Sequence, residues 1–214
     1  RERLLQPGTL LFAKSPQRST VYRPVYTDVV LVKRLNDAGE VIGAYRFLGL
    51  YTASAYQQSP SQIPLVRHKV AAVQERAGLD LSDYSGRELE QILATYPLDE
   101  LFQIDTDELY NIALSVLNIQ ERRQIRLFLR EDALGRFVSA LVYVPRDRYN
   151  AELRQKISNL LVEALGASDV EFVTHFSESV LARRLFTPRV QPMEQRALNA
   201  REMENQIRAL AQSW

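Results

Sequence analysis

The first 60 residues alternate short apolar runs with turn-forming stretches, which is typical of β-strands joined by tight turns. The β-rich runs are residues 8–14, 28–35 and 41–52, and the sequence Asn-Asp-Ala-Gly-Glu at 36–40 separates the last two. An Asn/Asp/Gly turn between two such runs predicts a β-hairpin. Residues 1–60 are therefore expected to form a β-rich unit.

The strand at 28–35 is apolar on both faces. Val29 and Leu31 fall on one face, and Val30 and Val32 fall on the other, because successive side chains of a strand point to opposite sides. We therefore expect other elements to pack over both faces. Since so short a stretch cannot easily do this alone, we expect part of this β unit to lie upstream of Arg1.

Helical spacing replaces the β pattern over residues 61–99. Pro64 stands where a first helical position tolerates proline, and Gly78 is a stop signal. Ser85 with Glu88 forms a capping-box pattern for a second, shorter helix. The apolar positions of the two helices are Leu65, Val66, Val70, Val73, Leu89, Ile92 and Leu93. We interpret this part as a helical connector.

From residue 100 onward, strand and helix patterns follow one another in a regular order. The predicted elements are a strand at 101–104, a helix starting at Asp105, strands at 124–130 and 136–144, a helix at 151–165, and strands at 170–176 and 182–187. This order is β-α-β-β-α-β with one extra strand. It is the ferredoxin-like split βαβ, in which an antiparallel sheet carries both helices on one face.

An amphipathic pattern over residues 192–214 predicts one more helix, which we expect to lead into a following part of a longer chain. The sequence thus predicts an α+β protein in four parts. They are the β-rich unit at 1–60, the helical connector at 61–99, the ferredoxin-like domain at 100–188 and the C-terminal helix at 189–214.

The apolar run at 137–144 ends abruptly in a proline and three charged residues, at 145–148. Pro145 cannot donate a hydrogen bond to a strand neighbour, and Asn150 is a natural N-cap for a helix that starts at Ala151. We interpret the cluster as the corner where a strand turns into a helix. The alternative is a ligand or subunit contact through Arg146 or Arg148.

Composition and charge narrow the class of protein. The share of hydrophobic residues, 46%, and of charged residues, 25%, is that of a soluble globular protein, and the net charge of +1 provides no strong field toward nucleic acid or a membrane. No apolar run approaches the roughly 20 residues of a spanning helix. We expect a cytoplasmic protein, and we interpret the chain, which starts at Arg1 without methionine, as an excised segment.

The candidate chemistry is sparse. The chain contains no cysteine and only two histidines, His68 and His175, which gives no catalytic triad and no metal-ligand set. Its eight glycines form no dinucleotide or phosphate-binding motif. The acidic residues at 99–108 are interpreted as solvated charges at a helix start. We therefore predict no catalytic residues, no cofactor-binding residues and no metal site.

Single-stranded RNA binding is an alternative, because RNA-recognition domains use exposed aromatics on a ferredoxin-like sheet. Phe128, Phe137 and Tyr143 fall on adjacent predicted strands. Arg126, Arg130 and Arg136 flank them. However, Ser139 and Leu141 follow Phe137 on its face, whereas the RNA-binding motif requires aromatics at alternate positions. Phe128 is more typical of a buried or interface residue.

Four stretches together resemble a known family. They are FLGLYTASAYQQSPSQIPLVRHKVAAV, TYPLDELFQIDTDELYNIAL, RLFLREDALGRFVSALVYVPRDRYNAELRQKI and SESVLARRLF. Between about Leu48 and Phe186 the chain is similar to the N-terminal regulatory region of the large bacterial NAD-specific glutamate dehydrogenases. The resemblance implies an ACT-type ferredoxin-like domain beside helical and PAS-like parts, with 1–60 belonging to the PAS-like unit. It also implies that a distant catalytic domain deaminates glutamate to 2-oxoglutarate with NAD.

No active-site residue of that family can be transferred to this segment, because its substrate lysines, nucleotide-binding glycines and catalytic aspartate have no matching positions. ACT domains often bind an amino acid where the first strand meets the first helix. Here that loop contains Asp105 and Thr106 and lacks the usual glycine. The resemblance therefore implies contacts with other domains of the same polypeptide and a homo-oligomer, with amino-acid sensing as the alternative. Asp105, Thr106, Phe128, Arg146 and Arg148 are the candidate effector or interface residues.

Overall fold

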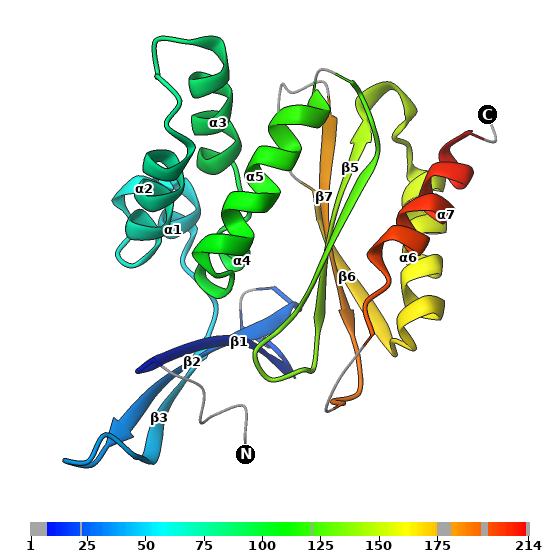
Figure 1. Ribbon diagram of the computed structural model, residues 1–214. Coiled ribbons are helices and arrows are strands. Elements are labelled where there is room, and N and C mark those ends of the chain that lie inside the picture. Colours follow the sequence, from blue (N-terminus) through cyan, green and yellow to red (C-terminus); the bar gives the residue numbers. More distant parts are fainter. Residues whose placement is uncertain (1–7, 22, 121, 175–180, 194–196, 213–214) are drawn as a thin grey trace.

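The computed structural model describes residues 8–21, 23–120, 122–174, 181–193 and 197–212. Its elements form two antiparallel sheets with helices between and around them (Figure 1). The smaller sheet has three strands and comes first in the chain, and the larger has four. No helix in these residues is long and apolar enough to cross a membrane.

The smaller sheet contains β1 (Leu10–Arg18), β2 (Tyr26–Leu35) and β3 (Val41–Gly49), in that spatial order. The predicted hairpin is confirmed. Its turn is closed by the amide of Asn36 donating to the carbonyl of Glu40 at 3.0 Å. Gly39 has a φ of 79° in this turn, a conformation that glycine adopts without steric cost.

Helices follow the smaller sheet and extend beyond both ends of the predicted connector at 61–99. They are α1 (Ala53–Gln57), the 3₁₀ turn η2 (Pro60–Gln62), α2 (Val66–Ala77), α3 (Tyr84–Ala94), α4 (Leu98–Gln103) and α5 (Thr106–Gln120). Gly78 ends α2 in the left-handed conformation, as expected. The start of α3 differs from the prediction, because Asp83 and not Ser85 occupies the N-cap position.

The strand predicted at 101–104 is wrong, because these residues lie in or next to helix α4. Pro97 precedes the helix, and Asp99 and Glu100 lie in its first turn, where the helix dipole favours negative charge. Leu98 and Leu101, three residues apart, are both buried. These helix-start signals decide the conformation, since four apolar-rich residues alone do not distinguish a strand from a helix.

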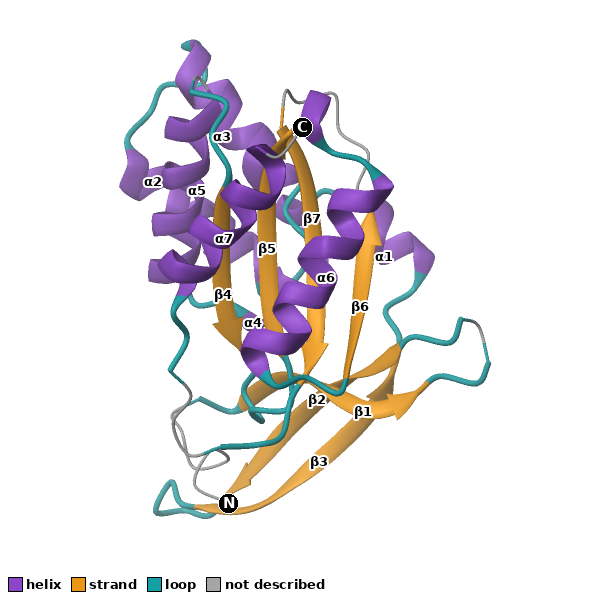
Figure 2. Ribbon diagram, turned by 90° about the vertical axis from the view of Figure 1, so that its right-hand side faces the viewer, coloured by secondary structure: helices purple, strands orange, loops and turns teal. Residues whose placement is uncertain are grey.

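The larger sheet contains β4 (Arg126–Glu131), β5 (Val138–Pro145), β7 (Leu181–Arg189) and β6 (Asp169–Thr174), in that spatial order. The helices α6 (Ala151–Leu165) and α7 (Ala200–Gln212) cover one of its faces (Figure 2). The chain order is therefore β-β-α-β-β-α. Moving β7 and α7 ahead of β4 would give β-α-β-β-α-β, so the sheet is ferredoxin-like in space and cyclically permuted in sequence.

Helix α7 is the second helix of this layer, which corrects the expectation of a separate C-terminal helix at 189–214. Met203, Ile207 and Ala211 of α7 join the core between α6 and the sheet. Glu204 accepts a hydrogen bond from the amide of Leu127 at 3.0 Å, and Arg208 donates to the carbonyl of Ile125 at 3.2 Å. These hydrogen bonds hold α7 beside β4, the first strand of the larger sheet.

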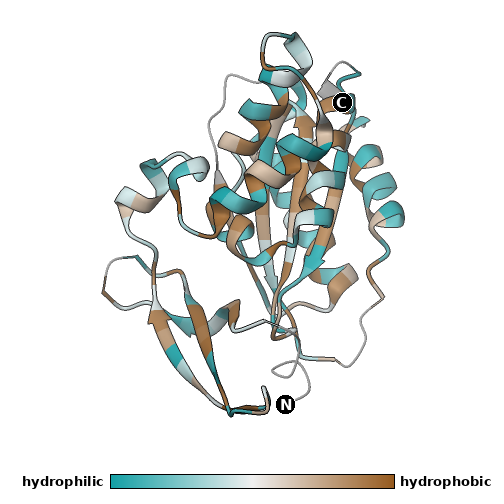
Figure 3. Ribbon diagram, turned by 60° about the vertical axis from the view of Figure 1, so that its left-hand side comes forward, coloured by the Kyte–Doolittle hydropathy of each residue, from teal (hydrophilic) through white to brown (hydrophobic). Residues whose placement is uncertain are grey.

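Both faces of the larger sheet are covered. Every residue of β5 is buried, which explains why its sequence is apolar except for Ser139 and does not alternate. The face opposite α6 and α7 packs against α5, where Leu141, Tyr143 and Leu185 share a core with Leu109 and Val116. Figure 3 shows the hydrophobic residues along the strands behind the helices.

The smaller sheet is covered less completely. Val29 and Leu31 of β2 are buried, on the face that contacts Ala133 and Leu134 of the β4–β5 turn. Val30 and Val32, on the opposite face, are only half-buried. The expectation that both faces of this strand would be covered is thus met fully on one face and in part on the other.

Candidate functional site

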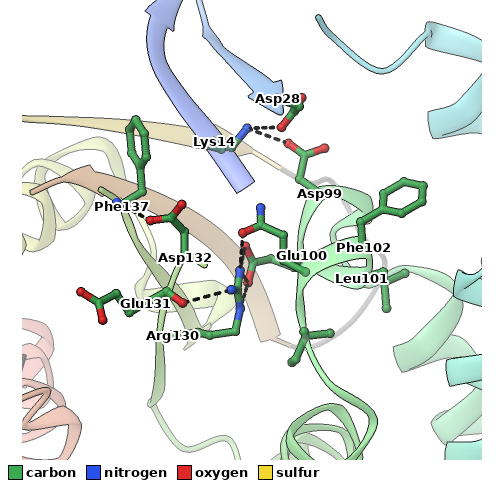
Figure 4. Close-up of polar contacts among 12 residues, drawn as sticks. Lys14, Asp28, Asp99, Glu100, Leu101, Phe102, Arg130, Glu131, Asp132 and Phe137 are labelled. Carbon is green, nitrogen blue, oxygen red and sulfur yellow. Dashed lines mark hydrogen bonds and ion pairs between the residues drawn. The ribbon is translucent and has the colours of Figure 1, made fainter. Parts of the chain in front are cut away.

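Helix α4 lies between the two sheets and is connected to each by an ion pair. We call Lys14, Asp28, Asp99, Glu100 and Arg130 the α4 junction (Figure 4). Two neighbouring acids of the first turn of α4 point in different directions: Asp99 toward the smaller sheet and Glu100 toward the larger one. One short helix therefore connects both units.

On the side of the smaller sheet, Lys14 of β1 lies between two carboxylates. Its Nζ is 2.9 Å from Asp28 Oδ1 and 3.4 Å from Asp99 Oδ2. The hydroxyl of Tyr56 donates to Asp99 Oδ1 at 2.7 Å. Lys14 and Asp28 are both buried, so their charges are compensated within the protein and not by water.

Burial and the neighbouring charges shift the pKa values of Lys14 and Asp28. Burial alone would lower the pKa of Lys14, but the carboxylates of Asp99 and Asp28 outweigh it and raise that pKa. Burial raises the pKa of Asp28 to about 6, because the opposing effect of Lys14 is smaller and the charge of Asp99 adds to the increase. The junction therefore contains one carboxyl group that titrates well above the usual range of aspartate.

On the side of the larger sheet, Glu100 and Arg130 of β4 form a two-point contact. Arg130 Nε donates to Glu100 Oε2 at 3.1 Å, and Nη2 donates to Oε1 at 2.9 Å. Such bidentate pairs are the strongest and most directional of the ordinary ion pairs. Gln103 at the end of α4 accepts a further bond from Arg130 at 3.3 Å. Both ends of α4 are thus held to β4.

A second polar contact joins the edges of the two sheets. Arg18 of β1 pairs with Asp169 and, at 2.7 Å, with Glu171 of β6. The hydroxyl of Tyr26 donates to Asp169 at 2.9 Å, and its ring meets Phe137 edge-on, with centroids 4.9 Å apart. Polar contacts at α4 and at β6 therefore hold the smaller sheet to the larger one, in addition to the apolar contact at the β4–β5 turn.

A cavity of about 580 Å³ lies beside the α4 junction, between β1, the start of α2 and the loop from α4 to α5. Asp105 and Thr106, two of the predicted candidate residues, line it. Asp105 is also the expected helix cap, because it accepts a hydrogen bond from the amide of Glu108 at 2.7 Å. Residues from the start of α2, which is distant in sequence from Asp105 and Thr106, line the same cavity.

The other candidate residues lie elsewhere. Arg146 and Arg148 are exposed in a short 3₁₀ turn, η3 (Arg146–Arg148), and Asn150 caps α6 by accepting from the amide of Leu153 at 2.8 Å. This confirms the interpretation of the cluster as a corner. Arg148 lines a separate cavity of about 450 Å³ with the end of α7. The candidate residues therefore do not form one site.

The aromatic residues on which the RNA-binding alternative depends do not form an open face of this sheet. Phe137 is 1% exposed and Tyr143 5% exposed. Phe128 is half-buried, packs against the core beneath α5 and meets Tyr143 edge-on. Because α5 covers the face on which bases would stack, these aromatics cannot serve as a stacking platform. Phe128 is a packing residue between the sheet and the helical connector.

No group of three or more His, Cys, Asp or Glu side chains within the described residues is arranged to hold a metal ion. His68 is exposed at the edge of the 580 Å³ cavity. His175 and the predicted strand end at 175–176 lie outside the described residues. The charged groups of the α4 junction contact one another, with Lys14 shared by two carboxylates, so the junction provides structural contacts between the two sheets.

Two family models match most of the chain. Residues 63–122 match the helical motif 1 of glutamate dehydrogenase, and residues 126–214 match its ACT2 domain. The chain belongs to the NAD-specific glutamate dehydrogenase family. The ACT2 match starts at β4 and includes α7, whereas the sequence suggested an ACT-like domain at 100–188. The helical motif contains α2 to α5, including α4, which was expected to be the first strand of that domain.

Curated relatives agree with this assignment. The chain is 46% identical over 211 residues to the NAD-specific glutamate dehydrogenase of Pseudomonas aeruginosa and 44% identical over 208 residues to that of Halomonas elongata. It is 34% identical over 181 residues to the enzyme of Mycobacterium tuberculosis. These matches cover 99%, 97% and 85% of this chain, but only 13%, 13% and 11% of the three relatives.

Reasoning from the sequence missed Lys14, Asp28 and Lys69. Its interpretation of Asp99 and Glu100 as solvated charges is wrong, because both are held in ion pairs and Glu100 is buried. Lys14 and Asp99 are 85 residues apart, and Glu100 and Arg130 are 30 apart. Lys69 of α2 donates to the carbonyls of Leu101, Phe102 and Ile104 at 2.7–3.0 Å. No short-range pattern links such positions. The one available signal was the pair of acids after Pro97, which indicates a helix start.

Proposed function

We propose that this chain is a non-catalytic regulatory and assembly segment of an NAD-dependent glutamate dehydrogenase, whose full-length form converts glutamate to 2-oxoglutarate and ammonia. The observation that carries this proposal is the α4 junction, in which Asp99 and Glu100 connect two sheets through buried ion pairs. Such a connection fixes the relative position of the two units. The names of the relatives support the activity of the full-length enzyme.

The proposal assigns no catalytic residue and no NAD site to this segment. The partners are other domains of the same polypeptide and further copies of it in a homo-oligomer, and the location is the cytoplasm. An amino-acid effector is the second candidate function, supported by the cavity that Asp105 and Thr106 line.

Turnover tests the non-catalytic part of the proposal. The purified chain is expected to form no NADH from glutamate and NAD, while the full-length enzyme does so under the same conditions. NADH absorbance is the measurement. Glutamate-dependent NADH formation by the chain alone would show that it carries an active site and would overturn the proposal.

Charge reversal tests the regulatory part in the full-length enzyme. Lys14→Glu places a third carboxylate beside Asp28 and Asp99, so the two units should separate or shift, and glutamate oxidation or oligomer size should change several-fold. Arg67→Glu is the matched control, because Arg67 is exposed on α2. Equal activity and oligomer size in both variants would contradict a regulatory or assembly role for the junction.

A further inference from the structure

The 580 Å³ cavity beside the α4 junction has the size of a small-molecule site, for which about 300–1,000 Å³ is usual. It is lined mostly by β1, the first turn of α2, and the end of α4 with the loop to α5, which are distant in sequence, and Lys33 of β2 and Ala133 of the β4–β5 turn also line it. A molecule bound there would contact the smaller sheet and the helical motif at the same time.

One wall of the cavity is aromatic and aliphatic. Phe12 of β1 and Phe102 of α4 both line it, and their rings stack with centroids 5.1 Å apart. Leu10 and Leu65 also line it, and they remain 37% and 45% exposed. Apolar side chains that face a cavity and stay partly in contact with water favour the binding of an apolar group.

The cavity is also lined by Lys69, which forms no ion pair with a carboxylate among the described residues. The three hydrogen bonds of Lys69 all go to neutral carbonyls, those of Leu101, Phe102 and Ile104. Burial and the charge of Arg130 lower the pKa of Lys69, and Asp105 opposes this only in part. The three hydrogen bonds use all three donors of the ammonium group, so an anion that entered the cavity would be attracted by its charge and would take the place of one of the carbonyls.

The backbone at the edge of the cavity is strained. Leu65 has a φ of 69° and a ψ of −51°, and the amide of Val66 donates to the carbonyl of Pro64 at 2.9 Å. This is a classic γ-turn, which is rare and strained for a residue other than glycine. Strained residues of this kind concentrate at ligand sites and switch regions. The strain is therefore a second, independent feature of the same cavity.

We propose that the cavity binds a small organic carboxylate with an aromatic or apolar tail, the carboxylate toward Lys69 and the tail against Phe12 and Phe102. The bound molecule holds β1, α2 and the α4–α5 loop together and so stabilises the arrangement of the two sheets. This consequence for regulation rests on the proposed function. The binding itself does not, because it can be measured on the chain directly.

Calorimetric titration with 3-phenylpropanoate tests the proposal, with 3-phenylpropanamide and acetate as matched probes. The amide has the same tail without the charge, and acetate has the charge without the tail. Because a charged group contributes more to such contacts than a neutral one, 3-phenylpropanoate should bind at least about tenfold more tightly than either. Equal binding of acid and amide, or no saturable heat at millimolar acid, would overturn the proposal.

A pair of variants then locates the site. Leu10→Glu places a negative charge at the edge of the cavity, and Leu10→Gln places a neutral group of the same shape there. Since Leu10 is partly exposed on an edge strand, both variants should fold. Leu10→Glu should lower the affinity for 3-phenylpropanoate at least about fivefold relative to Leu10→Gln, and it should leave the affinity for the amide unchanged. Equal affinities of the two variants for the acid would place the binding elsewhere. A negative result in the titration or with the Leu10 variants would not change the outcome of the charge-reversal test of the α4 junction.

Discussion

The two sheets of this chain are stabilised in different ways. The larger sheet is enclosed between helices, and all of β5 is buried. The smaller sheet leaves large apolar side chains on β3 in contact with water, since Tyr45 is 58% exposed and Phe47 59%. Its connections to the rest of the molecule are ion pairs at α4 and β6 and a small apolar contact with the β4–β5 turn. The larger sheet is thus fixed by burial of a large apolar area, whereas the smaller one has only a small apolar contact and is positioned in addition by a few directional charges.

This difference suggests which contacts can change without unfolding the protein. Apolar packing distributes its free energy over many contacts, so no single group controls it. A buried ion pair concentrates the effect in two side chains, because loss of one partner leaves the other charge uncompensated. Contacts between the sheets are therefore more sensitive to one substitution or one proton than the contacts within the larger sheet.

The largest effect is expected at Glu100. Glu100→Leu leaves Arg130 buried without its carboxylate and should lower the free energy of unfolding by about 3–5 kcal/mol. Denaturation with urea measures the change. The double variant Glu100→Leu with Arg130→Met removes both charges and should recover most of the loss. If the double variant is as unstable as the single one, the two residues contribute through packing, and the comparison between the sheets fails.

The next effect compares the two sheets directly. Leu161 of α6 is fully buried against the larger sheet, so Leu161→Ala should cost about 3 kcal/mol. Phe47→Ala removes an exposed side chain from the smaller sheet and should cost less than about 1 kcal/mol. Thermal and urea unfolding give both values. A loss at Phe47 as large as that at Leu161 would mean that the exposed face of β3 is covered in solution.

The smallest effect concerns pH. Burial raises the pKa of Asp28 to about 6, so the folded protein binds this proton more tightly than the unfolded chain does. The contribution of Asp28 to stability is therefore present below its ordinary pKa and is lost as the pH rises through about 6. Asp28→Asn removes this dependence. Its stability relative to the unmodified chain should rise by on the order of 1 kcal/mol between about pH 4 and about pH 7. If the difference in the free energy of unfolding between Asp28→Asn and the unmodified chain does not change with pH, the prediction is wrong.

The elements with strong local signals could be predicted from the sequence. The turn at 36–40 fixed the hairpin of the smaller sheet, Asn150 and Gly166 mark the two ends of α6, and Asp105 caps α5. In each case the signal and its effect lie within a few residues. The ferredoxin-like class was predicted correctly, but with residues 101–104 and α5 as the first strand and helix, where the structure has β7 and α7.

Tertiary context decided what the sequence could not. The amphipathic pattern of α7 indicates a helix with one apolar face but does not say which sheet it covers. Residues 101–104 contain too few positions to distinguish the periods of a strand and a helix, so they were assigned to the wrong element. The cavity depends on Phe12, Leu65 and Asp105 meeting in space, and no spacing in the sequence relates these three positions.

The cyclic permutation of the larger sheet affects how the unit fits into a longer polypeptide. Its first strand, β4, and its last helix, α7, are neighbours, joined by Glu204 and Arg208. The points at which the backbone enters and leaves are therefore adjacent. A unit of this kind can be inserted between two other parts of a protein without separating them, in the way that domains with neighbouring termini tolerate insertion and transfer.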